Sequence, residues 1–345
     1  MHYTRFFRLC FSASILTVIV VLLGAWVRLE DAGLGCPDWP GCYGMLLGVP
    51  ETEEAIEAAN QVYPERPVHV GKAWKEMIHR YVAGILGLLV FAIAVVSVRN
   101  RRDPGQPLRL PLFLAVLIIF QSILGMWTVT WQLKPLVVTM HLLGGMSTLA
   151  LLWWLTLRSG AILRPAELTH PLARLRPWVI AVMAVVVGQI ALGGWVSTNY
   201  AALACTDFPR CGGQWIPDAD YSDAFVLWKG LGVDYEFGVL DHPARVAVHF
   251  VHRVGAVITA VAVIGVAAAL WMRARARLHR QLAVALVGLL AIQWVLGITN
   301  VLASLPLSVA VAHNGGAALL LLSVLTLYHT LRPLPSSEPT HGTPA

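Results

Sequence analysis

Four histidines stand inside long apolar stretches of the chain, where an ionisable side chain is costly and usually marks function. They are His79, His141, His252 and His313. Counted from the expected helix starts at 1.5 Å per residue, His79 and His141 lie about 8–10 Å below one membrane surface. His252 and His313 lie at a similar level. Because two imidazoles on facing helices form the ligand set of a six-coordinate heme iron, the histidines predict two heme-sized sites.

Other roles for these histidines are less consistent with the pattern. A single histidine in a membrane helix ordinarily makes an interhelical hydrogen bond, but here the histidines are matched in depth. A zinc site would need three or four clustered ligands that include cysteine or carboxylate, and none is expected at that depth. Glycines in the same stretches would let a flat macrocycle approach the helices, although ordinary close packing uses glycine in the same way.

One carboxylate accompanies the first histidine. Glu76 precedes His79 by three positions, which places both on one helix face, and the equivalent residue in the second half is His249. A carboxylate here could accept a proton or balance positive charge that develops beside a bound heme. An ion pair with Lys72 or Lys75 is the structural alternative. The difference between the halves suggests one catalytic half and one electron-carrying half.

An arginine follows the first histidine of each half. Arg80 and Arg253 each carry a forked guanidinium, which suits the paired oxygens of a heme propionate. The alternative is that both side chains extend toward the nearby membrane surface.

Two pairs of cysteines lie in the polar segments between apolar stretches, and the members of each pair are six positions apart. Cys36 with Cys42, and Cys205 with Cys211, could each close a small ring as a structural disulfide. Electron exchange with a partner thiol is the alternative. Cys10 has no partner in the repeat and is expected to be a buried thiol.

The composition predicts an all-α integral membrane protein. Of the 345 residues, 57% are hydrophobic and 13% are charged, whereas a soluble domain averages about 25% charged. Eight stretches reach or approach the roughly 20 residues that cross a bilayer. The predicted helices are 9–29, 73–98, 110–132, 135–157, 177–199, 244–272, 281–302 and 308–331.

The charges predict the orientation. Short clusters of arginine alternate with acidic segments, and arginine in short loops marks the cytoplasmic side. The arginines of this side are Arg5, Arg8, Arg99, Arg101, Arg102, Arg109, Arg158, Arg164, Arg174, Arg176, Arg273, Arg275, Arg277, Arg280 and Arg332. The two long outer loops, 30–72 and 200–243, hold most of the acidic residues. Both termini are therefore expected in the cytoplasm, and the net charge of +6 needs no nucleic-acid partner to explain it.

The chain is internally duplicated. "GAWVRL" at 24–29 corresponds to "GGWVST" at 193–198, "CPDWPGC" at 36–42 to "CTDFPRC" at 205–211, and "IHRYVAG" at 78–84 to "VHRVGAV" at 251–257. "QSILG" at 121–125 likewise corresponds to "QWVLG" at 293–297. A repeat this long indicates two tandem four-helix bundles, 1–160 and 161–345, related by a pseudo-twofold axis along the membrane normal. Transporters share such repeats, but the broken helices that mark their substrate sites are not evident here.

These motifs resemble the heme A synthase family, membrane enzymes of cytochrome oxidase assembly. The resemblance rests on "RLEDAGLGCPDWPGCYG" at 28–44, "EMIHR" at 76–80, "TMHLLGG" at 139–145, "VHRVG" at 251–255 and "AHNGG" at 312–316. It covers essentially all eight predicted helices. It implies oxidation of a methyl group of heme O to a formyl group by successive hydroxylations with water-derived oxygen, which gives heme A for cytochrome c oxidase.

Residue by residue, the resemblance implies two distinct sites. His79 and His141 would hold the substrate heme O with Glu76 as the acidic residue needed for catalysis, whereas His252 and His313 would bind the iron of a b-type heme. The resemblance also implies a disulfide between the cysteines at 36 and 42, while the pair at 205 and 211 occurs only in some members.

The same resemblance sets expectations about surroundings. It implies a multi-pass protein of the bacterial inner membrane, in contact with lipid, with heme O synthase and oxidase assembly factors as possible partners. The electron acceptor would be a quinone or a partner thiol. The alternative function is a diheme b-type cytochrome that carries electrons between quinol and an acceptor without modifying its own heme.

Overall fold

The protein is an all-helical multi-pass membrane protein with eight helices long and apolar enough to cross a bilayer in the described part of the chain. The computed structural model describes residues 2–159 and 170–332. The long helices are α1 (His2–Leu29), α3 (Val70–Arg99), α4 (Arg109–Thr130), α5 (Pro135–Arg158), α7 (Arg176–Thr198), α9 (His242–Arg273), α10 (Arg277–Leu302) and α11 (Leu307–Thr330). Three short helices are α2 (Glu53–Val62), α6 (His170–Ala173) and α8 (Tyr221–Ala224). The predicted fold class is confirmed.

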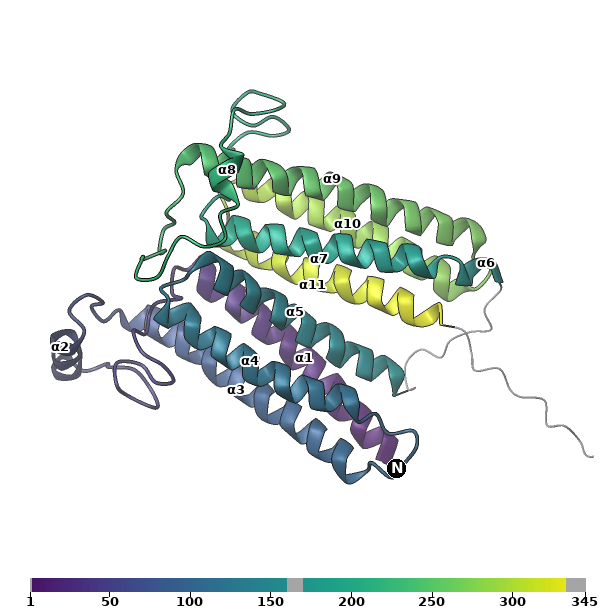
Figure 1. Cartoon of the computed structure of the whole chain (residues 1–345), viewed down its shortest axis with the longest axis horizontal. Helices are drawn as coiled ribbons and strands as arrows, with labels where there is room; N and C mark the ends of the chain where they lie inside the picture. The colour runs from purple at the N-terminus through teal and green to yellow at the C-terminus, as the bar shows by residue number, and fades with distance from the viewer. Residues whose placement is uncertain (1, 160–169, 333–345) are drawn as a thin grey trace, which may run out of the picture.

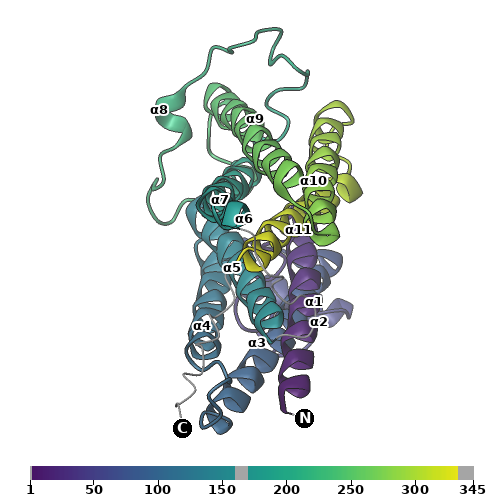
Figure 2. The ribbon, with the colours of Figure 1, turned by 90° about the vertical axis from the view of Figure 1, so that its right-hand side faces the viewer.

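The long helices form two groups that lie side by side (Figure 1). In the first group, α1 and α4 each pack against both α3 and α5. In the second group, α7 and α10 each pack against both α9 and α11. Helices α1, α5, α7 and α11 make the contacts between the groups, which Figure 2 shows from the end of the bundle. The pseudo-twofold axis stays a prediction, and the predicted boundary at 160/161 and Arg164 lie outside the described residues.

The same sharp turn joins the last two helices of each group. Gln132 and Leu133 adopt left-handed φ angles of 50° and 58° between α4 and α5. Ser304 and Leu305 do so between α10 and α11, with φ angles of 58° and 61°. Two consecutive left-handed residues reverse the chain within a few positions, which places the following helix antiparallel beside the preceding one.

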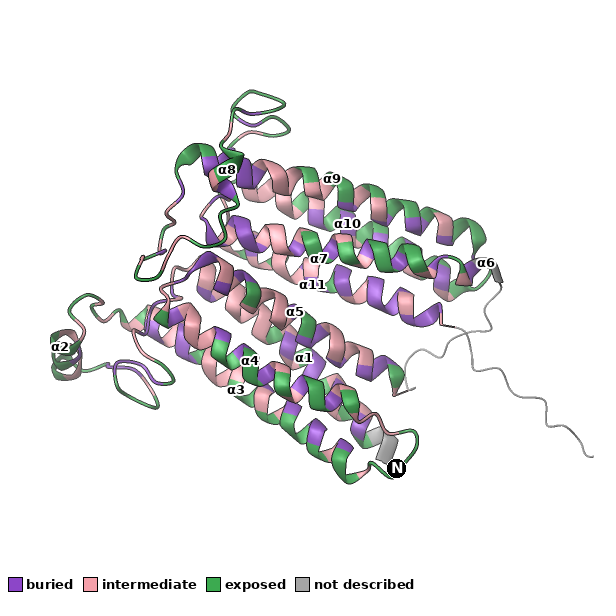
Figure 3. Cartoon of the chain, viewed as in Figure 1, coloured by how far each residue is buried: buried purple, intermediate pink, exposed green. Residues whose placement is uncertain are grey.

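The outward faces of the long helices are apolar. Exposed residues run along the length of α3, α4, α7 and α9 in Figure 3, and they include Leu88 on α3 and Val261 on α9. In water, such continuous apolar exposure would be unfavourable. Because these helices are also long enough to span a bilayer, lipid is the medium that these faces contact.

The two longest loops that the structure describes, one between α1 and α3 and the other between α7 and α9, lie at one end of the bundle, at the left of Figure 1. Helix α1 begins and α11 ends at the opposite end. The loop after α1 and the loop after α7 meet where Arg66 forms ion pairs with Asp234 and Glu236. The backbone N–H of Tyr235 also donates to the carbonyl of Gln132 at 3.1 Å. The second loop therefore reaches across and caps part of the first group.

Candidate functional site: two histidine pairs beside two disulfide loops

The first histidine pair lies between helices that present glycine to it. His79 projects from α3 toward α1, where a Cβ atom added to Gly24 would lie 3.1 Å from Cε1 of the imidazole. His141 projects from α5 toward α4, where a Cβ atom on Gly125 would lie 3.4 Å from Cε1. Each imidazole therefore occupies space that a larger residue on the neighbouring helix would fill.

The second pair repeats this arrangement. A Cβ atom on Gly193 of α7 would lie 3.3 Å from Cε1 of His252, which projects from α9. A Cβ atom on Gly297 of α10 would lie 3.4 Å from Cε1 of His313, which projects from α11. Matching histidines thus pack against matching glycines in the two halves, and the glycines have a specific task beyond general helix packing.

The buried nitrogens of these rings suit a metal group. The Nδ1 atoms of His79, His141 and His313 are buried without a hydrogen-bond partner in the described protein, although an unpaired buried polar atom is unfavourable. His79 is also close enough to His141 to interact with it electrostatically, as His252 is with His313. Imidazoles that are paired in space but not satisfied by the protein are a donor set that could hold a heme iron.

An amide beside the second pair has no counterpart in the first. The side-chain nitrogen of Gln189 on α7 lies 3.2 Å from Nδ1 of His252 and donates to the His252 carbonyl at 3.0 Å. The corresponding residue of the first half is Val20. The sequence analysis did not single out Gln189, although a lone amide in an uncharged helix at this repeat position was a usable signal.

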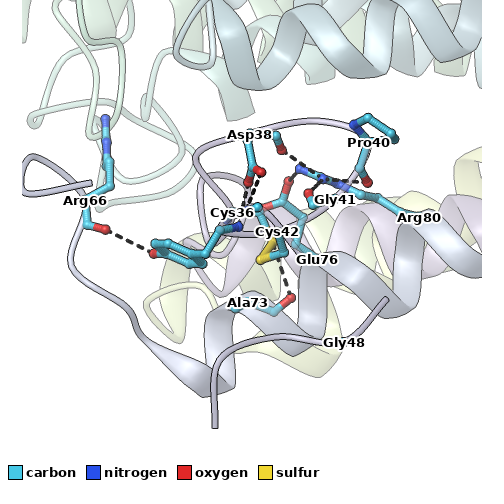
Figure 4. Close-up of a disulfide and its surroundings, with 12 residues drawn as sticks. Cys36, Asp38, Pro40, Gly41, Cys42, Gly48, Arg66, Ala73, Glu76 and Arg80 are labelled. Carbon is cyan, nitrogen blue, oxygen red and sulfur yellow. Dashed lines mark hydrogen bonds and ion pairs between the residues drawn. A yellow bond between two sulfur atoms is a disulfide. The ribbon is translucent and has the colours of Figure 1, made fainter. Parts of the chain in front are cut away.

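Glu76 is buried and tied to the first disulfide loop (Figure 4). Its Oε2 atom accepts a hydrogen bond of 2.9 Å from the backbone N–H of Cys36, and its Oε1 atom pairs with the Arg80 guanidinium. Arg80 in turn donates to three carbonyl groups of the loop. These belong to Asp38, Pro40 and Gly41. One carboxylate and one guanidinium therefore fix the loop against α3.

The second half keeps the arginine and changes the acid. Arg253 donates to three loop carbonyls, those of Cys205, Asp207 and Arg210. His249 takes the place of Glu76, and its Nδ1 atom lies 2.9 Å from the carbonyl oxygen of Ala201. An imidazole thus contacts a backbone carbonyl where the first half has a carboxylate that accepts a hydrogen bond from a backbone N–H.

Both cysteine pairs form disulfides, Cys36 with Cys42 and Cys205 with Cys211. The free cysteine among the described residues is Cys10, which is buried as predicted. The disulfide rings lie directly beside α3 and α9 through the arginine contacts described above. The expected pairings are therefore present, while both the structural and the redox role of the pairs stay predictions.

An aspartate inside each ring holds the turn that follows it. Asp38 accepts hydrogen bonds from the backbone N–H groups of Tyr43 and Gly44, at 2.6 and 2.7 Å. Asp207 accepts from Gly212 and Gly213, at 2.7 and 2.9 Å, and these N–H groups hold the pKa of Asp207 below its ordinary value. The recurrence of aspartate two positions after the first cysteine was the sequence signal for this role.

The ion-pair partners differ from those considered in the sequence. Glu76 pairs with Arg80 on the next turn of the helix, whereas Lys75 pairs with Glu30. The alternative of a Glu76 pair with a lysine is therefore wrong. The expected propionate contacts of Arg80 and Arg253 stay predictions, since both guanidinium groups already bind loop carbonyls. The Nε atom of Arg253 is buried without a hydrogen-bond partner in the described protein.

Fold and site together define a class: a helical membrane protein with two paired-histidine sites, each beside a disulfide loop. Comparison with known proteins then gives the family. Residues 7–325 match the COX15-CtaA family, described as cytochrome oxidase assembly protein. The chain belongs to this family.

Several relatives of this chain are named heme A synthase. The heme A synthase of Shewanella oneidensis is 47% identical over 92% of this chain and 94% of its own. Those of Paracoccus denitrificans and Halalkalibacterium halodurans are 30% and 29% identical, over 92% and 87% of this chain and 85% and 88% of their own. The resemblance stated from the motifs is confirmed.

Proposed function

We propose that this protein is a heme A synthase, an oxidoreductase that converts a methyl group of heme O to a formyl group. Overall, one methyl group and one water give one formyl group, four electrons and four protons. Two hydroxylations by water, each removing two electrons and two protons, give a hydrated aldehyde that loses one water. The four electrons leave to an acceptor, either a quinone or the oxidised, disulfide form of a partner's thiol pair.

The observation that carries the assignment of the two sites is the unequal placement of charge. Glu76 lies one helical turn from His79, and the corresponding position beside His252 holds His249. The first site, with His79 and His141, therefore suits the substrate heme O. The second site, with His252 and His313, suits a resident heme b, which would supply one-electron transfer when bound.

Glu76 has two tasks in this proposal. Its carboxylate lies on the histidine face of α3, where it stabilises positive charge that develops on the methyl carbon and accepts a proton from the attacking water. Arg80 and the N–H of Cys36 hold both carboxylate oxygens, so the group is oriented before the substrate binds. Oriented charge of this kind favours the transition state because it needs no rearrangement during the reaction.

The surroundings follow from the charges and the family. The arginine clusters favour an orientation in a bacterial inner membrane with both termini on the cytoplasmic side and the disulfide loops on the outer side. Water has short access to a site at that side, whereas the isoprenoid tail of heme O lies among the helices or in lipid. Heme O synthase and oxidase assembly factors are candidate partners that deliver the substrate and receive the product.

The test compares Glu76→Gln with His249→Gln, its counterpart in the second half. Each variant is purified, and its pigments are identified by mass spectrometry as heme B, heme O, the hydroxylated intermediate or heme A. We expect Glu76→Gln to keep heme B, accumulate heme O and lose heme A, and His249→Gln to retain heme A synthesis. Normal heme A with Glu76→Gln would contradict the catalytic assignment and favour the diheme electron carrier.

A further inference from the structure

Each disulfide loop ends in two exposed apolar residues. Leu46 and Leu47 are 74% and 77% exposed, and Trp215 and Ile216 are 66% and 78% exposed. Each pair comes four and five positions after the second cysteine, directly after a short antiparallel bridge that joins this cysteine to the residue three positions later. The two tips have different sequences, but both are exposed and apolar. An exposed apolar tip therefore recurs in both loops although the residues differ.

The first tip lies at the level of one membrane surface. Arg80 binds the loop carbonyls, and the backbone N–H of Gly48, the residue after Leu47, donates to the Tyr81 hydroxyl at 2.8 Å. No charged residue occurs on α3 between Arg80 and Arg99. At 1.5 Å per residue these arginines are about 28 Å apart, close to the roughly 30 Å of the hydrocarbon layer. The loop that Arg80 binds therefore lies at the outer boundary of that layer.

The second tip lies at the same level by the same argument. Arg253 binds the carbonyl of Arg210, which lies a few residues before Trp215. The uncharged part of α9 runs from Arg253 to Arg273, about 30 Å of helix. In Figure 1 this loop projects sideways from the outer end of α9, away from the rest of the bundle. A loop that projects sideways at this level lies over lipid.

The helices that bind the two loops expose apolar side chains close to the arginine contacts. Ile85 is exposed on α3, and Val254 and Val257 are exposed on α9, within about two turns after Arg80 and Arg253. The Arg210 guanidinium lies over the Trp215 ring with 5.4 Å to its centroid. Tryptophan with a neighbouring arginine is typical of the boundary between head groups and acyl chains.

We propose that both tips, Leu46–Leu47 and Trp215–Ile216, insert into the outer leaflet at the boundary between head groups and acyl chains. The lipid covers side chains that water would otherwise surround. Asp38 and Asp207 are used inside their loops, where they accept hydrogen bonds from backbone N–H groups. Since the first loop also binds Glu76 and Arg80, its lipid contact helps hold the charged group of the reaction in place.

The test places a photo-crosslinking amino acid, p-benzoylphenylalanine, at single positions of the full chain in lipid nanodiscs made of phosphatidylethanolamine and phosphatidylglycerol. The probe positions are Leu47 and Ile216. The matched control is Val62, which is 70% exposed on α2, beyond the outer ends of the spanning helices in Figure 1. Irradiated protein is digested, and lipid adducts are identified by mass spectrometry.

We expect lipid adducts at Leu47 and Ile216 at least tenfold more often than at Val62. Equal, low yields at all three positions would overturn the proposal, as would crosslinks in native membranes that join the tips to a protein and not to lipid. Each loop tests the proposal separately, so a poorly folded variant of one loop leaves the other decisive. The readout does not depend on heme, so its failure is distinguishable from failure of the proposed enzyme function.

Discussion

Arg80→Ala is the change that most directly tests how the first disulfide loop is held. It removes the ion pair with Glu76 and the donors to three loop carbonyls at once. Glu76 would then keep its hydrogen bond from Cys36 but lose its neutralising charge while it stays buried. The matched variant Arg253→Ala removes three carbonyl contacts but leaves no carboxylate without its partner.

The expected magnitude follows from the burial of the pair. The side chains of Glu76 and Arg80 are 5% and 13% exposed. Removing one partner of a buried ion pair costs about 3–5 kcal/mol, because the remaining charge has no compensation. We take the lower end, about 3 kcal/mol, since Arg80 lies at the boundary and water can reach the vacated space. This favours local opening of the loop by about a hundredfold.

The rate of disulfide reduction reports this opening. All four disulfide cysteines are buried, so a soluble phosphine reductant reaches them only when a loop opens. Alkylation at intervals, followed by peptide mass spectrometry, gives separate rates for Cys36–Cys42 and Cys205–Cys211 in one sample. In Arg80→Ala we expect the first rate to rise about a hundredfold and the second to stay unchanged.

Two results would refute this reasoning. Equal acceleration of both disulfides in Arg80→Ala would mean that the change destabilises the whole protein and not the first loop. Arg253→Ala could also accelerate the reduction of Cys205–Cys211 as much as Arg80→Ala accelerates that of Cys36–Cys42. This would mean that the carbonyl contacts, and not the unpaired Glu76, dominate. Combining Glu76→Gln with Arg80→Ala completes a double-mutant cycle. The first loop of the double variant should open less readily than that of Arg80→Ala alone.

Other contacts give further predictions. Gln189→Val should shift the midpoint potential of the second-half heme, measured by redox titration, because an amide beside His252 influences the iron through its ligand; a potential identical to the parent's would remove this role. Gly125→Leu should abolish heme O binding while heme B content is kept, measured on extracted pigments, since the leucine would occupy the space of the imidazole; unchanged heme O would count against a close fit. Arg66→Ala should lower stability toward unfolding in detergent by about 1 kcal/mol, with less effect at high salt, as for partly exposed ion pairs; a salt-independent loss would contradict an electrostatic contact.

Much of the fold followed from elementary patterns. Uncharged runs predicted all eight spanning helices, and their ends differ from the prediction mainly where a helix continues beyond the apolar stretch. Helix α3 begins at Val70, before the predicted 73, and α9 begins at His242, before the predicted 244. Hydropathy marks where a chain enters lipid, whereas a helix continues as far as its backbone hydrogen bonds can be made.

The contacts of the site were harder to predict than its residues. The repeat singled out the histidines, Glu76 and both arginines, but not that Arg80 would bind three carbonyls of a loop some forty positions earlier. Such contacts depend on how a loop folds back, which side-chain type and spacing do not determine. Lys72 and Arg80 both lie four positions from Glu76 along the helix, so spacing alone could not decide that Arg80 is its partner.

The two halves show how one duplicated scaffold can serve two purposes through very few polar positions. The arginine, its loop and the histidine pair are shared, so they support whatever binds in either half. The halves differ at two equivalent positions of the repeat. Glu76 of the first half corresponds to His249 of the second, and Val20 corresponds to Gln189. A fixed negative charge favours a reaction that builds positive charge, whereas a neutral amide beside a ligand histidine adjusts a resident heme without reacting. Because each half has one of these groups and lacks the other, the proposed function assigns substrate oxidation to the first half and electron transfer to the second.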